Sequence, residues 1–228
     1  MERILNFTML AKELITDEIP PLKPTDSGRK ALEWMDEFRV SHLPVVKGRE
    51  LVGLISETDI LDLNDAELPI AKLKTPILRP FVYETKHAFE VLKLISTLDI
   101  TIVPVLNEQQ QYLGVITMKN LMQKIAGMPA IHQPGGLLVL ELNVNDFSMT
   151  HIAQIVEGNN AKILHSYVNA HPDSTKIELT LKINKEDLSP IIQTFNRYNY
   201  TVKATFQESE YSEDMKSRFD EFWNYINI

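Results

Sequence analysis

The 228-residue chain contains one unit twice. An apolar strand with a proline, followed by an apolar strand with a glycine, occurs in both halves of its first 126 residues. Pro44 returns as Pro104, after 60 residues, and Gly53 as Gly114, after 61, so the second copy has one extra residue in its turn. Such a repeat indicates two supersecondary units, each too small to bury its own apolar face. We therefore expect the units to pack together around pseudo-symmetric clefts, where a small ligand would bind.

Apolar spacing predicts the same elements in both copies: a short strand, a helix, a β-hairpin and a closing helix. In the first copy these are a helix at 27–38, strands at 43–46 and 51–55, and a helix from Ser56 to about Leu63. In the second they are a helix at 86–98, strands at 102–106 and 112–116, and a helix from Thr117 to about Ala126. Residues 9–19 are expected to form a lead-in helix that ends before Pro20.

The pattern changes after residues 127–136, which have no periodicity and contain five helix breakers, as a linker would. Beyond them, residues 137–207 predict the ferredoxin-like order β-α-β-β-α-β. Ser148 and Asp187 are the expected N-caps of its two helices. The fold class is therefore α+β, with expected parts at 9–66, 70–127, 137–207 and 208–228.

The last part, residues 208–228, is predicted to be an amphipathic helix. Its apolar positions recur at helical spacing and include two of the bulkiest side chains of this segment, Phe222 and Trp223. A large apolar face seldom stays open to water. The helix is expected to dock either on its own chain or against another subunit, and the sequence leaves both alternatives open.

Composition excludes several functional classes. The chain has no cysteine, and its six histidines lack the spacing of paired metal ligands, so neither a disulfide framework nor a metal site is expected. The net charge is −8 and lysine and arginine do not cluster, which disfavours nucleic-acid binding. Apolar runs are too short to cross a membrane, and the first residues do not resemble a secretory signal, so a cytoplasmic location is expected. No catalytic fingerprint is present, and we expect no enzymatic activity.

Two strings carry a family resemblance. Leu43-Pro44-Val45-Val46 is followed by Gly53-Leu54-Ile55-Ser56-Glu57-Thr58-Asp59, which resembles the motif of a CBS domain. The second copy matches it with Thr117 but has Asn120 in place of the aspartate. Because the motif occurs twice in register, residues 9–126 resemble a Bateman module, which is a pair of CBS domains.

The resemblance implies an adenosine-containing ligand, such as AMP, ADP, ATP or S-adenosylmethionine. The carboxylate of Asp59 would accept hydrogen bonds from the ribose hydroxyls, with Ser56 assisting, and charge-assisted hydrogen bonds are strong ones. The base would lie along strand residues and the backbone near His42. The implied stronger site therefore comprises Ser56, Asp59, His42, Leu43 and Val45, and the weaker one comprises Thr117, Asn120 and Val103, because an amide lacks the charge.

The same residues also have a purely structural interpretation. Ser56 followed three residues later by Asp59 is a capping-box pattern, and Thr117 could likewise cap its helix. The two interpretations are compatible, since Ser56 can cap while Asp59 faces a cleft. Arg39 and His42 precede the proline strand and could meet a phosphate. Alternatively, Arg39 is a solvated residue at the end of a helix and His42 a surface residue at the strand entry.

Residues 137–207 resemble an ACT domain in element order and in the string Ile152-Ala153-Gln154-Ile155-Val156. The loop at 143–150 lacks the proline and glycine of amino-acid-binding members, so pairing of sheets between subunits is the expected role. The whole chain resembles regulatory proteins of the acetoin-utilisation type. We expect a non-catalytic sensor, homodimeric through its CBS pair, acting on a protein target that the sequence does not identify. The alternative is a structural or interaction protein whose clefts are vestigial and ligand-free.

Overall fold

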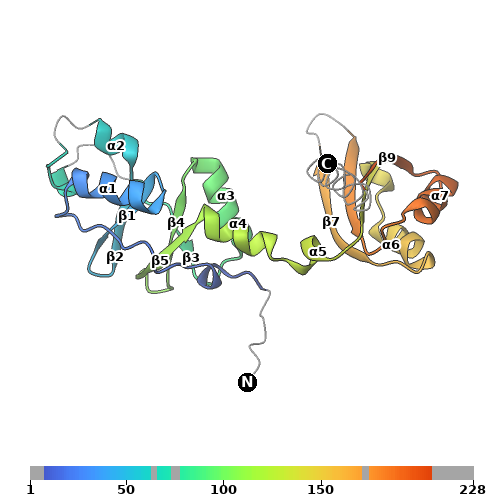
Figure 1. Ribbon diagram of the computed structural model, residues 1–228, viewed down its shortest axis with the longest axis horizontal. Helices are drawn as coiled ribbons and strands as arrows, with labels where there is room; N and C mark the ends of the chain where they lie inside the picture. Colours follow the sequence, from blue (N-terminus) through green and yellow to red (C-terminus); the bar gives the residue numbers. More distant parts are fainter. Residues whose placement is uncertain (1–7, 63–65, 73–77, 171–174, 207–228) are drawn as a thin grey trace, which may run out of the picture. The chain divides into compact units, whose positions relative to one another are not determined.

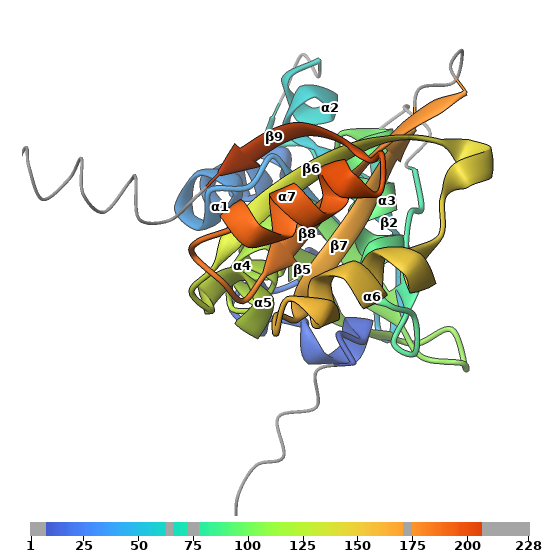
Figure 2. The same ribbon diagram turned by 90° about the vertical axis from the view of Figure 1, so that its right-hand side faces the viewer.

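The computed structural model of the chain describes residues 8–62, 66–72, 78–170 and 175–206. It divides the chain into two compact units, Met1–Ala126 and Gly127–Ile228 (Figures 1 and 2). The boundary lies at the start of the segment 127–136 that the sequence marks as a linker. That segment contains a short helix, α5 (Pro129–His132), which the sequence analysis did not predict.

The first unit contains the two copies, here called the first and second repeats. The first repeat consists of α1 (Gly28–Phe38), β1 (His42–Lys47), β2 (Glu50–Ser56) and α2 (Glu57–Leu61). After the 3-10 turn η2 (Ile70–Lys72), the second repeat consists of β3 (Val82–Tyr83), α3 (Ala88–Leu98), β4 (Ile102–Leu106), β5 (Tyr112–Thr117) and α4 (Met118–Ala126). The predicted helices and hairpins of both repeats are confirmed.

The two hairpins have matching registers. Pro44 lies opposite Leu54 in the pair β1–β2, and Pro104 lies opposite Val115 in the pair β4–β5. The predicted short strand before the first helix is present in the second repeat, where β3 pairs in parallel with β4. In the first repeat it is reduced to a single bridge at Leu22. The strands bury apolar side chains on both faces, which explains their continuous apolar sequence.

The expected helix at 9–19 is wrong. Only the 3-10 turn η1 (Ala11–Glu13) forms, because the backbone of residues 8–22 pairs with distant loops and strands instead. Ala11 donates its N–H to the carbonyl of Lys86 at 2.7 Å, and Thr16 donates to Val115 at 2.9 Å. Leu22 then donates to Pro44, in the first repeat, at 2.8 Å. Residues 8–22, the crossing segment, therefore contact both repeats.

The second unit has the predicted β-α-β-β-α-β order after α5. Its elements are β6 (Gly136–Asn143), the 3-10 turn η3 (Val144–Asp146), α6 (Met149–Gly158), β7 (Ile163–Ala170), β8 (Lys176–Ile183), α7 (Ser189–Arg197) and β9 (Thr201–Phe206). The strands form one antiparallel sheet in the order β7-β8-β6-β9, which is the ferredoxin-like arrangement. Both helices lie on the same face of this sheet (Figure 2).

The core of the second unit lies between this sheet and the two helices. Alternate residues of β6 and β8 point into it, including Leu140 and Leu179, and Phe195 of α7 is fully buried against them. Ser148 caps α6 as predicted, accepting the N–H of His151 at 3.4 Å. The expected N-cap Asp187 is wrong, because Leu188 occupies that position and Asp187 instead accepts the N–H of Ser189.

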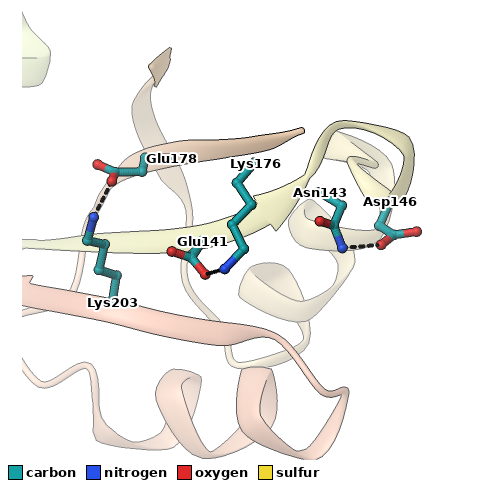
Figure 3. A network of polar contacts seen from close by, with 6 residues as sticks. All are labelled: Glu141, Asn143, Asp146, Lys176, Glu178 and Lys203. Carbon is teal, nitrogen blue, oxygen red and sulfur yellow. Dashed lines mark hydrogen bonds and ion pairs between the residues drawn. The ribbon is translucent and has the colours of Figure 1, made fainter. Parts of the chain in front are cut away.

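Charged side chains of β6, β8 and β9 form ion pairs on the face of the sheet opposite the helices (Figure 3). Glu141 and Glu178 lie directly opposite each other on β6 and β8, an arrangement in which like charges repel. Lys176 binds Glu141 at 2.5 Å, and Lys203 binds Glu178. The hydrogen bond and charge of Lys176 lower the pKa of Glu141, so the two lysines offset the repulsion.

The predicted helix at 208–228 lies outside the described residues. Within the described ranges, no helix combines the length and apolar character that a membrane span requires.

Candidate ligand-binding site

The hydroxyl and acid of the first repeat form a complete capping box. Ser56 ends β2 and its Oγ accepts the N–H of Asp59 at 3.1 Å. In return, Oδ2 of Asp59 accepts the N–H of Ser56 at 2.8 Å and its hydroxyl at 2.6 Å. The capping interpretation is therefore confirmed. It occupies one carboxylate oxygen of Asp59, whereas Oδ1 has no hydrogen-bond partner in the described part of the chain.

The second repeat has only half of this arrangement. Oγ1 of Thr117 accepts the N–H of Asn120 at 3.0 Å, so Thr117 caps α4. The side-chain amide of Asn120 forms no hydrogen bond to any described residue. Thr117 is buried and Asn120 is half-buried. The amide is thus available to a ligand as both a donor and an acceptor.

A cavity of about 560 Å³ lies beside Thr117 and Asn120, here called the Thr117 cleft. Its walls come from the crossing segment, the end of α1, the start of β4 and the start of α4. The apolar lining consists of Ile19, Phe38, Val40, Met118 and Met122, and the polar lining consists of Glu18, Glu37, Arg39, Thr101, Thr117, Lys119 and Asn120. Its volume falls within the range of small-molecule sites, and so does its mixture of an apolar wall with a few polar groups.

The residues proposed for the stronger site lie elsewhere. Ser56 and Asp59 line neither the Thr117 cleft nor the cavity of about 440 Å³ beside Glu57. Leu43 and Val45 are fully buried in the core of the first unit, as is Val103 of the weaker site. Of the residues singled out by the motif, the structure thus places Thr117 and Asn120 at the larger cavity.

His42 joins the two repeats. Its Nδ1 accepts the N–H of Thr101 at 3.3 Å and lies 3.2 Å from the Thr101 hydroxyl, which in turn accepts the N–H of Ser41. Because Nδ1 is an acceptor, the neutral ring carries its proton on Nε2. Burial lowers the pKa of His42, while the nearby carboxylates of Asp59 and Asp99 act in the opposite direction.

The second unit has two smaller cavities, of about 220 and 330 Å³, and both are lined by His151 and Tyr198. His151 is held by Tyr200, whose hydroxyl lies 2.8 Å from Nδ1. Among the described residues of the chain, no group of three or more acidic or histidine side chains is arranged to hold a metal ion.

Motif spacing alone did not identify most of the cleft. Glu18, Glu37 and Lys119 were not predicted, and Arg39 was only an alternative. These residues come from separate elements, so no local motif includes them. The duplication itself could have indicated them, because it predicts clefts between the two copies. Glu18 and Glu37 precede the strands of the first repeat, whereas Thr117 closes the hairpin of the second, so the Thr117 cleft combines residues from both copies.

Comparisons with known proteins identify the first unit. Residues 11–65 and 73–127 match the family model described as CBS domain. An uncharacterised 33.4 kDa protein in the ribosomal RNA operon of Thermofilum pendens is 38% identical over 74 residues, covering 32% of this chain and 24% of that protein. The inosine-5′-monophosphate dehydrogenase of Korarchaeum cryptofilum is 26% identical over 161 residues, covering 70% of this chain and 31% of the enzyme.

The chain therefore spans between a quarter and a third of the length of these relatives. Among solved structures, CBSX2 in complex with AMP is similar at 22% identity with a TM-score of 0.45, over 51% of this chain and 95% of that one. The two matches to the family model coincide with the two repeats seen in the sequence. The chain thus carries a tandem pair of CBS domains, at residues 11–65 and 73–127.

Proposed function

We propose that this chain is a regulatory module that binds an adenosine nucleotide in the Thr117 cleft. The observation that carries the proposal is the cavity itself, which has a volume of about 560 Å³ and a lining of apolar residues together with hydrogen-bonding ones. The sequence alone favoured a ligand site at Asp59 in the first repeat. The geometry favours Asn120, whose amide has no partner among the described residues, over a carboxylate already engaged in a capping box.

The lining suggests how the ligand is held. An adenine ring is flat and largely apolar, and it suits the surface made by Val40, Ile19 and Met122. The ribose then faces Thr117 and Asn120. An amide can accept one hydroxyl proton and donate to another oxygen, whereas a carboxylate accepts from both hydroxyls of a diol.

Regulation would follow from the way the cleft is built. Its walls belong to both repeats and to the crossing segment, so a ligand contacts all three at once. A ligand shifts a conformational equilibrium only when it binds one state better than the other. Binding would favour the state in which the two repeats pack so that these walls close on the nucleotide.

We further propose that the second unit is an ACT-like domain that pairs with a second copy of the chain. Strand β7 is at one edge of the sheet, and its Tyr167 and Val168 are about half exposed. An edge strand has unpaired backbone groups that another strand can bind. With the CBS pair, this gives a homodimer that passes ligand occupancy to a protein target.

Thermal unfolding with and without ligand tests the proposal. Adenosine, AMP, ADP, ATP and S-adenosylmethionine are each added in excess, and a ligand that binds the folded state raises Tm. Asn120→Ala is compared with Asp59→Ala, the matched position of the first repeat. We expect Asn120→Ala to lose most of the ligand-induced rise in Tm and Asp59→Ala to retain it, although the latter lowers the starting Tm.

The alternative is a structural protein with ligand-free clefts. It is favoured if none of the five compounds changes Tm or gives heat in titration calorimetry. The oligomeric state also separates the two functions, since a purely structural chain keeps the same oligomeric state whether or not nucleotide is present. Light scattering coupled to size exclusion measures that state for both conditions.

A further inference from the structure

The first half of strand β6, in the second unit, is apolar on both of its faces. Leu138 and Leu140 point into the core between the sheet and the helices. Leu137 and Val139 alternate with them, so they point to the opposite face. An antiparallel strand with one face in water alternates apolar and polar side chains, whereas a continuous apolar run is typical of a strand covered on both faces. This part of β6 therefore has the sequence of a strand that lies between two layers.

The strand registers place two rows of side chains across this opposite face, and together we call them the far-face patch. One row runs through Ala204, Val139, Thr180 and Tyr167, and the other runs through Phe206, Leu137, Lys182 and His165. Helices α6 and α7 lie on the other face, so neither of them can cover this patch. The ion pairs of Glu141 and Glu178 lie towards the other end of the strands (Figure 3).

The described part of the chain ends at this patch. Phe206 is the last described residue, belongs to the second row and is 59% exposed. The segment 208–228 follows it after a single residue. As a helix, this segment would be about 30 Å long, whereas four neighbouring strands span about 14 Å. It is therefore tethered beside the patch and is long enough to cross the whole sheet.

The apolar positions of this segment match the patch in extent. They recur at helical spacing and are Met215, Phe219, Phe222, Trp223 and Ile226. From the first to the last they would span about 17 Å of helix, which is close to the width of the sheet. An apolar stripe of this length fits rows that run across the strands.

The charges of the two surfaces are complementary. Residues 208–228 contain six acidic and two basic side chains. The far face of the sheet has three lysines, Lys176, Lys182 and Lys203, against two glutamates. Opposite net charges favour the docking of the segment on this face over its repulsion from it.

We propose that residues 208–228 dock as an amphipathic helix on the far-face patch of their own second unit, with the apolar stripe against Leu137, Val139 and Ala204. The sheet then lies between two helical layers. Because the far face is closed in this way, a second copy of the chain can pair with the sheet only along an edge strand. The inference does not depend on the nucleotide site.

Fluorescence of Trp223 in the full chain tests the docking. The chain has two tryptophans, so Trp34→Phe leaves Trp223 as the only one. We expect its emission to be blue-shifted and protected from acrylamide. Val139→Asp places a charge beneath the helix and should shift the emission to the red and raise the quenching constant. Val168→Asp is the matched control, because Val168 lies opposite Leu179 and faces the helical side; it should change neither quantity.

Cross-linking keeps the proposal testable if Val139→Asp does not fold. Because the chain has no cysteine, Val139→Cys with Phe222→Cys provides the only two thiols for a short bismaleimide. We expect a link within one chain, seen as a single-chain band whose intact mass includes one reagent. The pair Val168→Cys with Phe222→Cys should give no such link.

Three results would overturn the proposal. A link between two chains would show that the patch holds the segment of a second copy. Equal linking from Val168 would show that the segment does not select the far face. Trp223 as accessible to acrylamide in the folded chain as in urea, without any link to Val139, would show that the segment does not dock.

Discussion

The backbone N–H of Thr101, in the second repeat, donates to Nδ1 of His42, in the first, at 3.3 Å. The bond requires an unprotonated Nδ1. It joins the two repeats at the residue that also lines the Thr117 cleft, since Thr101 is part of that wall. Protonation of His42 would therefore break a hydrogen bond at the wall of the Thr117 cleft.

The first prediction concerns pH. Burial lowers the pKa of His42 in the folded chain, so between this pKa and the unfolded value of about 6.5 the unfolded chain binds more protons. The free energy of unfolding should therefore fall as the pH drops below about 6.5. Below the folded pKa, His42 is protonated in both states and no longer contributes to this fall. Urea unfolding between about pH 5 and 8 measures this. His42→Asn, which keeps an acceptor near Nδ1, should flatten the dependence, whereas the exposed His132→Asn should not. An unchanged slope in His42→Asn would contradict the assignment.

The second prediction concerns the capping boxes. Ser56→Ala should lower the free energy of unfolding by about 1 kcal/mol, since it removes the acceptor for the N–H of Asp59 and leaves the box open. Thr117→Ala should cost a similar amount. Both are measured by urea unfolding, with the exposed Thr175→Ala as a control. A Ser56→Ala variant as stable as the wild type would show that the box contributes nothing.

The third prediction concerns the close approach of the crossing segment to Gly114 of β5. A Cβ added there would lie 2.5 Å from Cγ2 of Ile15, and the residue has φ of +153°, so Gly114→Ala should destabilise the chain by about 1–3 kcal/mol. Ile15→Ala should partly rescue it, which a double-mutant cycle detects as coupling. Gly48→Ala is the control, because its φ is +65° but its Cβ would meet nothing within 4 Å. Additive effects of Gly114→Ala and Ile15→Ala would refute the close approach.

The fourth prediction concerns Arg39 and Asp99, which follow α1 and α3 in the left-handed conformation. Arg39→Gly should raise the free energy of unfolding by up to about 1 kcal/mol, because glycine adopts the left-handed conformation without the Cβ penalty that arginine incurs. Asp99→Gly should gain less, since aspartate tolerates that conformation. Thermal and urea unfolding compare the two variants directly. A loss of stability in Arg39→Gly would mean that the arginine supports the fold.

The sequence predicts the hairpins and helices of both repeats because their patterns are local. Ser27 and Ser148 accept backbone N–H groups at helix starts, as their positions beside apolar periodicity indicate. The segment at 9–19 was mistaken for a helix because its backbone partners, among them Lys86 and Val115, lie 70 to 100 residues further on. Local apolar spacing contains no information on such partners, and tertiary pairing overrides helix propensity.

The candidate site was harder to predict than the fold. The motif identifies Thr117 and Asn120, but whether a cavity opens beside them depends on side chains such as Phe38 and Met122, which no motif specifies. Ser56 and Asp59 match the motif better and satisfy each other instead. The motif therefore selects candidate residues, and the packing around each copy decides whether a cavity lies beside them.

The crossing segment has a consequence for how the chain is made. A chain that leaves the ribosome from its N-terminus exposes Ala11 and Thr16 long before Lys86 and Val115 exist, yet those are their backbone partners. Contacts of such large sequence separation form late and slowly. The first repeat thus cannot complete its packing during its own synthesis. The two copies become a folded module only when the second has been translated, so a duplicated sequence gives a single folding unit.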